Sequence, residues 1–486
     1  MNTNSIDKKR NIVWSFLKQY SSYAIKVLVQ VILARLLLPS DFGVIAIVLA
    51  VISLAETISA SGLGTALIQK NDAEIKDYAT VLTASLVFSS VIYLLLFLFA
   101  PLISSYYDNQ ILTPILRVYG IAIFIQSYAS VQSAFVIKKF KFKQIFLATL
   151  FSTLISGTIS IVLAIKGFGL WALVVQGLLS SIFIVILLHI LVPWVPHIGF
   201  DKTRFKSLFS FSWKVLLSSL TGKILEESYN LTIGKIYGED VLGYYKQGNS
   251  YAGAVLGQAR SALESVMFPI YTSLQNDSDS LKLEIKKMTN LSTFIVFPMA
   301  FGLAAISKTF ISVILTDKWL PCLLFLRLEC IFYGTLPIAS SLGNAMTAIG
   351  RSDVSLKIEI TKLVLTIVCI LCLHNASVEL LCIVRVIIAL AVTICSSFIS
   401  GKLLNYGFFE LIKDIYKPFL FSLIMGSSCF LVSFLDINYV LILIIQVLAG
   451  ILIYLVLSLL FMRDSLFEIK NIFIKKKYEE QTESIE

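Results

Sequence analysis

The sequence predicts an all-α polytopic membrane protein with about 14 transmembrane helices, and three observations support this fold class. Hydrophobic residues make up 57% of the 486 residues and charged residues 14%, whereas a typical soluble chain has about 25% charged residues. Apolar runs of about 20 residues, the length that crosses a bilayer core, recur along the chain. Lys and Arg residues gather in alternate loops. Together these observations exclude a soluble enzyme, a disordered chain and a disulfide-rich secreted domain.

The apolar runs follow one another along nearly the whole chain. We expect spans at residues 14–37, 42–64, 78–104, 111–135, 144–165, 169–192, 207–233, 241–269, 288–315, 322–347, 358–374, 378–400, 418–435 and 439–461. The first, seventh and eighth of these segments are the most polar, so a hydropathy profile alone supports them weakly.

The basic residues predict the orientation of these spans. An even number of spans puts both termini on one side, and the loops on that side contain 25 of the 40 Lys and Arg residues, against three in the opposite loops. Cytoplasmic loops carry such an excess, so we expect a multi-pass protein with both termini in the cytoplasm. Basic loops beside anionic lipids account for the net charge of +10 without a nucleic-acid partner.

The Cys and His residues give no sign of a metal site or a cofactor. All seven Cys residues lie beyond residue 320, mostly in apolar runs, where a thiol acts as a small hydrophobic group. Cys369 and Cys372 form a CxxC pair inside TIVCILCL, a context that favours packing over redox chemistry. Of the three His residues, only His197 has a carboxylate at helical spacing, in Asp201. The sequence therefore predicts no metal and no cofactor.

Two loop-flanked segments resemble each other at an offset of 200 residues. Residues 33–43 read LARLLLPSDFG and residues 233–243 read IGKIYGEDVLG, which aligns Gly43 with Gly243. Each segment ends one polar span and begins the next, and six spans separate them. This position favours a parallel repeat of two six-helix lobes, a common plan in transporters.

The residues around these segments also resemble a known family. The run ARLLLPSDFGVIAIVLAVISLAETISASGLGTALIQ, from Ala34 to Gln69, and the run LTIGKIYGEDVLGYYKQGNSYAGAVLGQARSALESVMFPIYTSLQND, residues 231–277, are similar to the bacterial polysaccharide flippases of the polysaccharide transport family. That family belongs to the MOP superfamily of multidrug, oligosaccharidyl-lipid and polysaccharide exporters. With the number of spans, the resemblance extends over nearly the whole chain.

The resemblance implies a MATE/MOP-like fold and a carrier rather than an enzyme. Residues 1–200 would form an N-lobe of helices 1–6, residues 201–405 a C-lobe of helices 7–12, residues 406–462 helices 13 and 14, and residues 463–486 a cytoplasmic tail. The cargo would be an undecaprenyl-diphosphate-linked oligosaccharide for O-antigen, capsule or exopolysaccharide, moved across the bacterial cytoplasmic membrane by alternating access. Membrane lipids, a polysaccharide polymerase and glycosyltransferases are the partners that this role implies.

Cations inside the spans are candidates for binding the diphosphate of such a cargo. The first span places a polar stripe on one helix face: Ser15, Lys18, Ser22, Lys26 and Gln30. Lys26 lies near mid-span, where it cannot easily reach an interface, and it is the better candidate for cargo contact. Lys18 lies near the cytoplasmic boundary, where it either contacts cargo or snorkels to the interface.

Local spacing also predicts charge pairs. Lys223 precedes Glu226 and Glu227 by three and four residues, and Arg260 precedes Glu264 by four, so each cation can be neutralised on its own helix. The Arg260–Glu264 pair is either a closed structural pair or one that opens when diphosphate takes the Arg.

Glu56 stands alone in an apolar run, as an ion-coupling site or as a partner of Lys26. The substrate-binding candidates are Lys26, Lys223, Arg260, Lys18 and Arg117, and the ion-coupling or charge-pair candidates are Glu56, Glu226, Glu227 and Glu264.

Two other functional classes share some of these features. A multidrug cation antiporter of the same superfamily would have this fold, but its cavity should favour carboxylates, and the cations of spans one, seven and eight favour an anionic cargo. A membrane polysaccharide polymerase or ligase would need a larger outer loop for its catalytic residues, whereas the outer loops here have about ten residues or fewer. We therefore expect a flippase.

Overall fold

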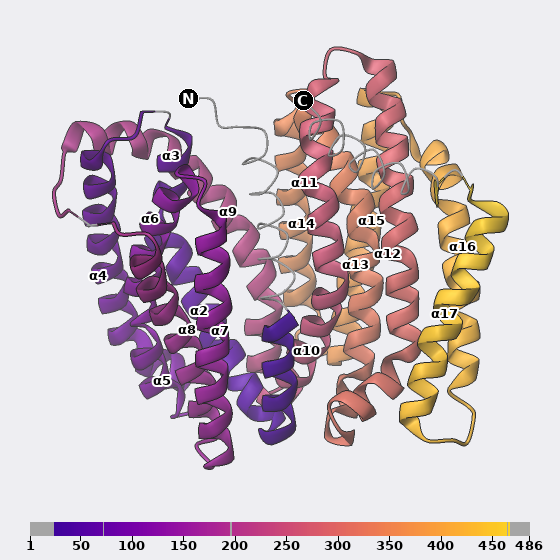
Figure 1. Cartoon of the computed structure of the whole chain (residues 1–486), viewed down its shortest axis with the longest axis horizontal. Helices are drawn as coiled ribbons and strands as arrows, with labels where there is room; N and C mark the ends of the chain where they lie inside the picture. Colours follow the sequence, from indigo (N-terminus) through magenta and orange to yellow (C-terminus); the bar gives the residue numbers. More distant parts are fainter. Residues whose placement is uncertain (1–23, 71, 195–196, 464, 467–486) are drawn as a thin grey trace, which may run out of the picture. The chain divides into compact units, whose positions relative to one another are not determined.

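The computed structural model describes residues 24–70, 72–194, 197–463 and 465–466, and helices account for the regular structure in these ranges (Figure 1). The chain divides into two compact units, residues 1–246 (unit 1) and residues 247–486 (unit 2). The expected lobe boundary at residue 200 differs from this division because α9, which follows that boundary, packs on α2 and belongs to unit 1. The lobe boundaries at residues 200, 405 and 462 stay a prediction, and most of the tail lies outside the described residues.

Unit 1 begins with a helix over residues 24–36. It continues with α2 (Pro39–Ala60), α3 (Leu63–Gln69), α4 (Ile75–Tyr106), α5 (Leu112–Tyr119), α6 (Ala122–Lys138), α7 (Phe142–Ile165), α8 (Leu170–Leu191), α9 (Lys202–Ile236) and most of α10 (Glu239–Ala252). The α2 helix lies among α4, α6 and α9.

Unit 2 begins within α10, at Gln247. It contains the π-helix η1 (Gly253–Gly257), α11 (Gln258–Ser273), α12 (Ser278–Ile314), the 3-10 helix η2 (Asp317–Cys322), α13 (Leu323–Ala348), α14 (Ser352–Cys372), α15 (Val378–Leu404), α16 (Phe408–Val432) and α17 (Tyr439–Phe461). The α12 helix packs against α13, α16 and α17.

Each of the fourteen expected segments coincides with helix in the described part of the chain, although their ends differ by several residues. Within that part, ten helical segments are long and apolar enough to cross a membrane. The remaining expected spans correspond to residues 24–36, α9, α10–α11 and α14, which carry more polar or charged residues. A multi-pass membrane protein is therefore shown, whereas the count of fourteen stays a prediction.

Helix boundaries follow local capping chemistry. Pro39 starts α2, where its missing N–H costs nothing, and Asp41 accepts a hydrogen bond from the Leu38 amide (3.0 Å). Asp201 caps α9 by accepting hydrogen bonds from the amides of Thr203 (2.8 Å) and Arg204 (3.1 Å). These backbone hydrogen bonds hold the pKa of Asp201 below its usual value.

The two segments related by the 200-residue offset meet at the N-terminal ends of α2 and α10. A Cβ atom added at Gly43 would overlap the backbone of Glu239, whose carbonyl carbon would be 2.6 Å away, and one added at Gly243 would lie 2.8 Å from the carbonyl carbon of Pro39. Position 39 corresponds to position 239 and position 43 to position 243, so the contact is reciprocal. We call it the paired-glycine contact, and its two-fold character agrees with a repeat.

A buried triad of hydroxyl groups joins three helices of unit 1. The Oγ atoms of Ser59 on α2, Ser89 on α4 and Ser127 on α6 lie 2.6–2.8 Å from one another. Small residues allow the close approach of these helices, and the hydroxyl groups satisfy one another away from water.

Asp77, at the start of α4, is a fully buried carboxylate held by three groups. Its oxygens accept hydrogen bonds from Lys70 Nζ (2.8 Å) and the Glu74 amide (2.9 Å), and one lies 3.2 Å from Arg204 Nη1 on α9. The carboxylate therefore fixes the ends of α3, α4 and α9 together.

We expect Asp77→Asn to destabilise unit 1 by about 2 kcal/mol, because Lys70 and Arg204 lose their shared negative charge. A lower midpoint of thermal unfolding of the detergent-solubilised protein would measure this loss. The control is Glu74→Gln: Glu74 also contacts Arg204 but its side chain is 64% exposed, so its removal should cost less than about 1 kcal/mol. Equal shifts in the two variants would contradict the assignment.

Candidate functional site

Lys223 on α9 is surrounded by carboxylates. Its Nζ atom lies 2.8 Å from Glu226 Oε2 and 3.6 Å from Glu227 Oε1, as the spacing predicts. It also interacts electrostatically with Glu56 on α2. Two carboxylates thus lie within 3.6 Å of one ammonium group, and its charge acts on a third carboxylate. We call Lys223, Glu226, Glu227 and Glu56 the acidic cluster. A diphosphate would be repelled here unless a pair opened, so the geometry favours the charge-pair role of Lys223.

Glu227 joins the acidic cluster to the neighbouring helix. It is 5% exposed and accepts hydrogen bonds from Ser53 Oγ on α2 (3.3 Å) and from Asn230 Nδ2 (2.6 Å). Glu56 lies about one turn after Ser53, and its charge also acts on the Tyr119 hydroxyl. The structure thus brings Glu56 towards Lys223, and no hydrogen bond or ion pair with Lys26 is found among the described residues.

Lys26 and Lys246 form a region of positive charge, in contrast to the acidic cluster. Their charges are close enough to repel each other, with Lys26 exposed and Lys246 half-buried. Within the described ranges, neither ammonium group has a carboxylate oxygen at ion-pair distance. Two cations that repel each other favour the binding of an anion nearby. Lys246 belongs to the eighth expected segment, residues 241–269, and spacing alone could not show that its charge acts on Lys26.

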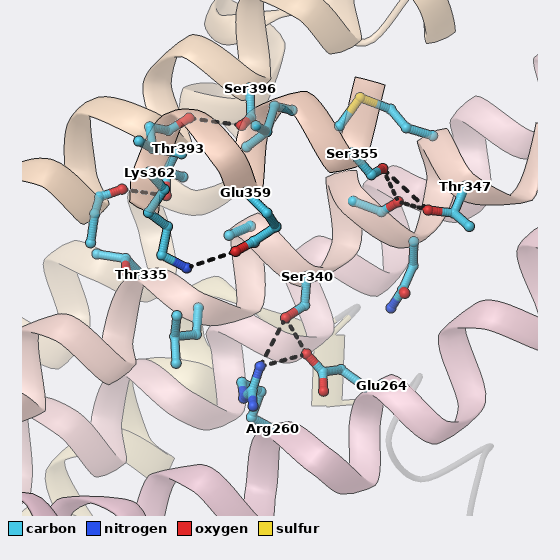
Figure 2. A pocket seen from close by; sticks show the side chains of 18 of the residues that line it. Arg260, Glu264, Thr335, Ser340, Thr347, Ser355, Glu359, Lys362, Thr393 and Ser396 are labelled. Atoms are coloured by element: carbon cyan, nitrogen blue, oxygen red, sulfur yellow. Dashed lines mark hydrogen bonds and ion pairs between the residues drawn. The ribbon is translucent and has the colours of Figure 1, made fainter. Parts of the chain in front are cut away.

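Arg260 pairs with Glu264 on the same helix, α11, as the spacing predicts, and a residue of a second helix joins them (Figure 2). Arg260 Nη1 lies 2.9 Å from Glu264 Oε1. Ser340 of α13 donates its hydroxyl proton to the same oxygen and lies 3.5 Å from Arg260 Nη1. Arg260 Nε is buried without a hydrogen-bond acceptor among the described residues. Arg260, Glu264 and Ser340 thus form a cluster in which the Arg260 Nε donor has no acceptor among the described residues.

This cluster lines a cavity of about 270 Å³ within unit 2 (Figure 2). Side chains from α11, α13, α14 and α15 form its wall. A second pair, Lys362 Nζ and Glu359 Oε2 at 3.4 Å, comes from α14. Glu359 and Lys362 were not among the candidates from the sequence, although their spacing of three residues at the start of the 358–374 segment is a signal for a pair.

Arg117 on α5 contacts the neighbouring helix α4. Its Nε atom donates a hydrogen bond to the Phe97 carbonyl (3.3 Å), its guanidinium lies 4.2 Å from the centre of the Phe97 ring, and the Tyr93 hydroxyl donates to the Arg117 carbonyl (3.1 Å). These contacts hold α5 against α4 and favour a structural role for Arg117. Lys18 lies outside the described residues.

A buried ion pair in unit 2 was not predicted from the sequence. Arg385 on α15 pairs with Glu329 on α13, whose side chain is 4% exposed, and the guanidinium lies 4.1 Å from the centre of the Phe332 ring. No local spacing connects residues 56 positions apart, so only the tertiary structure reveals this pair.

Four of the seven thiols are buried, whereas Cys369 is half-buried and Cys372 and Cys395 are exposed. Cys429 Sγ donates to the Gln446 carbonyl (3.3 Å), and Gln446 Nε2 donates to the Cys429 carbonyl (3.0 Å), which joins α16 to α17. A search of the described part of the chain finds no group of three or more His, Cys, Asp or Glu residues placed to hold a metal ion.

Comparison with known proteins identifies relatives along most of the chain. Residues 32–324, more than half of the chain, match a family model described as polysaccharide biosynthesis protein. The succinoglycan biosynthesis transport protein ExoT of Rhizobium meliloti (strain 1021) is 25% identical over 345 residues, which cover 71% of this chain and 70% of the relative. The teichuronic acid biosynthesis protein TuaB of Bacillus subtilis (strain 168) is 23% identical, with 78% and 79% covered.

Solved structures share the fold. The lipid II flippase MurJ in an inward closed conformation matches with a TM-score of 0.75 and 16% identity, over 93% of this chain and 99% of that one. An inward-facing multidrug resistance transporter of the MATE family and MOP superfamily matches with a TM-score of 0.60 and 16% identity, over 80% and 97%. At such low identity these matches establish the fold alone, and a flippase and a drug transporter both have it.

Proposed function

Because this chain belongs to the family of polysaccharide biosynthesis proteins, we propose that it is a flippase for an undecaprenyl-diphosphate-linked oligosaccharide in a bacterial cytoplasmic membrane. The family match over residues 32–324 is the observation that carries this proposal. Two relatives that share more than two thirds of their length with it are named for the biosynthesis of succinoglycan and of teichuronic acid, and the first is named as a transport protein. The role is transport, with no chemistry on the sugar.

The pair Lys26–Lys246 is the part of unit 1 that we assign to the diphosphate. Both lysines lack a carboxylate partner within the described ranges, and their mutual repulsion is relieved when an anion binds between them. Lys223 and Arg260 are already paired with Glu226, Glu227 and Glu264, so each can contribute only after its pair opens. We keep Lys18 and Arg117 as weaker candidates.

The acidic cluster around Lys223 supports a second element of the proposal, a cation-binding step. Its surplus of two carboxylates over one ammonium group attracts a cation, which would be a coupling ion in a flippase or a drug in a multidrug antiporter. The MATE-like fold is compatible with both. The phenotype of a deletion strain separates them.

Alternating access requires contacts that separate when the cavity opens outward. Several polar contacts join residues 107–109, which follow α4, to the end of α9 and the start of α10, on the side that the positions of the basic residues predict to be outside: Lys235 with Asp108 (2.9 Å), Tyr107 with the Leu231 carbonyl (3.1 Å) and Asn109 with Glu239. The paired-glycine contact lies beside them. We propose that these contacts close the outer side, that both termini are cytoplasmic, and that a polymerase or glycosyltransferases act before and after transport.

Deleting the gene is expected to remove the corresponding surface glycan and to leave lipid-linked repeat units on the cytoplasmic leaflet. The glycan should fall to background in a strain without another such transporter, and a plasmid copy of the wild-type gene should restore it. Surface glycan is measured by gel electrophoresis of polysaccharide extracts, and leaflet location by glycosidase protection in oriented vesicles. If the deletion strain keeps its surface glycan and becomes sensitive to cationic drugs, the protein is a multidrug antiporter and not a flippase.

A further inference from the structure

The cavity of unit 2 has walls that are polar but electrically balanced. Two cations, Arg260 and Lys362, are each paired with a carboxylate, Glu264 and Glu359, so the four charges sum to zero. A diphosphate would meet two carboxylates here and no surplus of positive charge. The cavity is therefore unsuited to the charged part of the proposed cargo and better suited to a neutral polar group.

The hydroxyl groups in the wall act as hydrogen-bond acceptors. Thr335, Thr393 and Ser396 donate their protons to carbonyl groups of their own helices, at 2.7–2.8 Å. A hydroxyl oxygen whose proton is engaged in this way still offers lone pairs. Arg260, Lys362 and the Asn344 amide supply the donors. A ligand that both donates and accepts at many points, as a polyol does, matches this wall, whereas an anion that only accepts does not.

The remaining wall is apolar and the space is small. Phe332, Leu336, Met346 and Ile358 contribute apolar surface beside the polar groups. A pyranose ring has an apolar C–H face and a rim of hydroxyl groups, so it can use both kinds of surface. The volume of about 270 Å³ lies just below the roughly 300–1,000 Å³ of typical ligand sites. This is space for about one sugar ring rather than for an oligosaccharide.

We infer that the cavity lined by α11, α13, α14 and α15 binds one neutral pyranose residue of the lipid-linked glycan. This inference rests on the proposed function and adds a class of ligand to it. It makes unit 2 the part of the chain that distinguishes a sugar-bearing lipid from the bare lipid diphosphate, through Asn344, Thr393, Ser396 and the Arg260–Glu264 pair.

Binding measurements on the full-length protein in lipid nanodiscs test the inference. The probes are undecaprenyl diphosphate, the same lipid carrying a single glucose, galactose or N-acetylglucosamine, and the free methyl glycosides of these sugars. We expect at least one sugar-bearing lipid to bind about fivefold or more tightly than the bare lipid, as for one or more additional hydrogen bonds. The free glycosides should bind much more weakly.

Variants of adjacent serines provide a matched comparison. Ser396 lines the cavity, whereas the next residue, Ser397, is fully buried outside the lining and also bonds to a carbonyl of its own helix. Ser396→Ala combined with Thr393→Val should remove most of the preference for the sugar-bearing lipid and leave the affinity for undecaprenyl diphosphate unchanged. Ser397→Ala should keep the preference.

The possible results separate this inference from the proposed function. Equal affinities for the bare lipid and all sugar-bearing lipids would overturn the sugar site while leaving lipid diphosphate binding intact. Binding of the free glycosides alone would identify a soluble sugar as the ligand and would also overturn it. An equal loss of preference in the Ser397 variant would show that the cavity is not responsible. If no lipid diphosphate binds at all, the proposed function itself fails.

Discussion

Replacing Lys26 and Lys246 together by Glu is expected to abolish transport. Two cations without a carboxylate partner among the described residues would become two anions, so attraction of the diphosphate would turn into repulsion. A hydrogen bond to a charged group contributes about 1.5–3 kcal/mol, so each single change to Gln should weaken binding about 10- to 100-fold. The double change to Glu should leave no measurable transport.

Replacement by Arg separates charge from side-chain packing. Lys26→Arg and Lys246→Arg keep the positive charge and should retain much of the activity, whereas Lys26→Gln keeps a similar length without the charge and should not. Lys166→Gln, which removes an exposed lysine from a short loop, is the control and should transport normally. Transport is measured in proteoliposomes and normalised to the amount of protein. A double Gln variant with the wild-type rate would remove the pair from the proposed mechanism.

Adding a methyl group at either member of the paired-glycine contact is expected to stop the transport cycle with the protein still folded. At Gly43 and Gly243 the added Cβ would overlap the backbone of the opposite helix, and backbone cannot rotate away as a flexible side chain can. The N-terminal ends of α2 and α10 would be forced apart, and the closed outer side would lose its tightest contact. We expect at least a tenfold loss of transport for Gly43→Ala and for Gly243→Ala.

Hydrogen exchange tests whether these substitutions act at the contact. Amide exchange in residues 37–44 and 237–244 should rise in both variants, because a change on one helix affects both ends of a reciprocal contact. Gly222→Ala is the control: a Cβ there meets no atom within 4 Å, and alanine favours a helix over glycine by about 1 kcal/mol. Normal transport by both glycine variants would show that the contact does not limit the cycle.

The sequence predicted the features that depend on nearby residues. Hydropathy over about 20 residues located the helices, because the membrane imposes that length on each of them separately. Spacings of three and four residues predicted the pairs of Lys223 with Glu226 and Glu227 and of Arg260 with Glu264, and the structure confirms these pairs.

Features that join distant parts of the chain were beyond such reasoning. The proximity of Lys26 to Lys246, the ion pair of Arg385 with Glu329 and the cavity of unit 2 depend on which helix faces meet. Composition and periodicity do not determine this choice, since several faces of each helix are apolar. Glu56 illustrates the limit: the sequence offered an ion site or Lys26 as its partner, and it could not show that the charge of Lys223 acts on this carboxylate.

The paired-glycine contact also shows what an internal repeat within one chain permits. Between two identical six-helix chains, a reciprocal contact of this kind would be isologous, and one change at the glycine codon would alter the interface twice. In one chain that contains both repeats, a substitution in one repeat leaves the equivalent position of the other repeat unchanged. Pro39 and Glu239, at equivalent positions, have diverged to different side chains, while Gly43 and Gly243 have kept the backbones within touching distance. A single chain with an internal repeat can therefore carry different side chains at equivalent positions while it keeps the close contact between the two backbones.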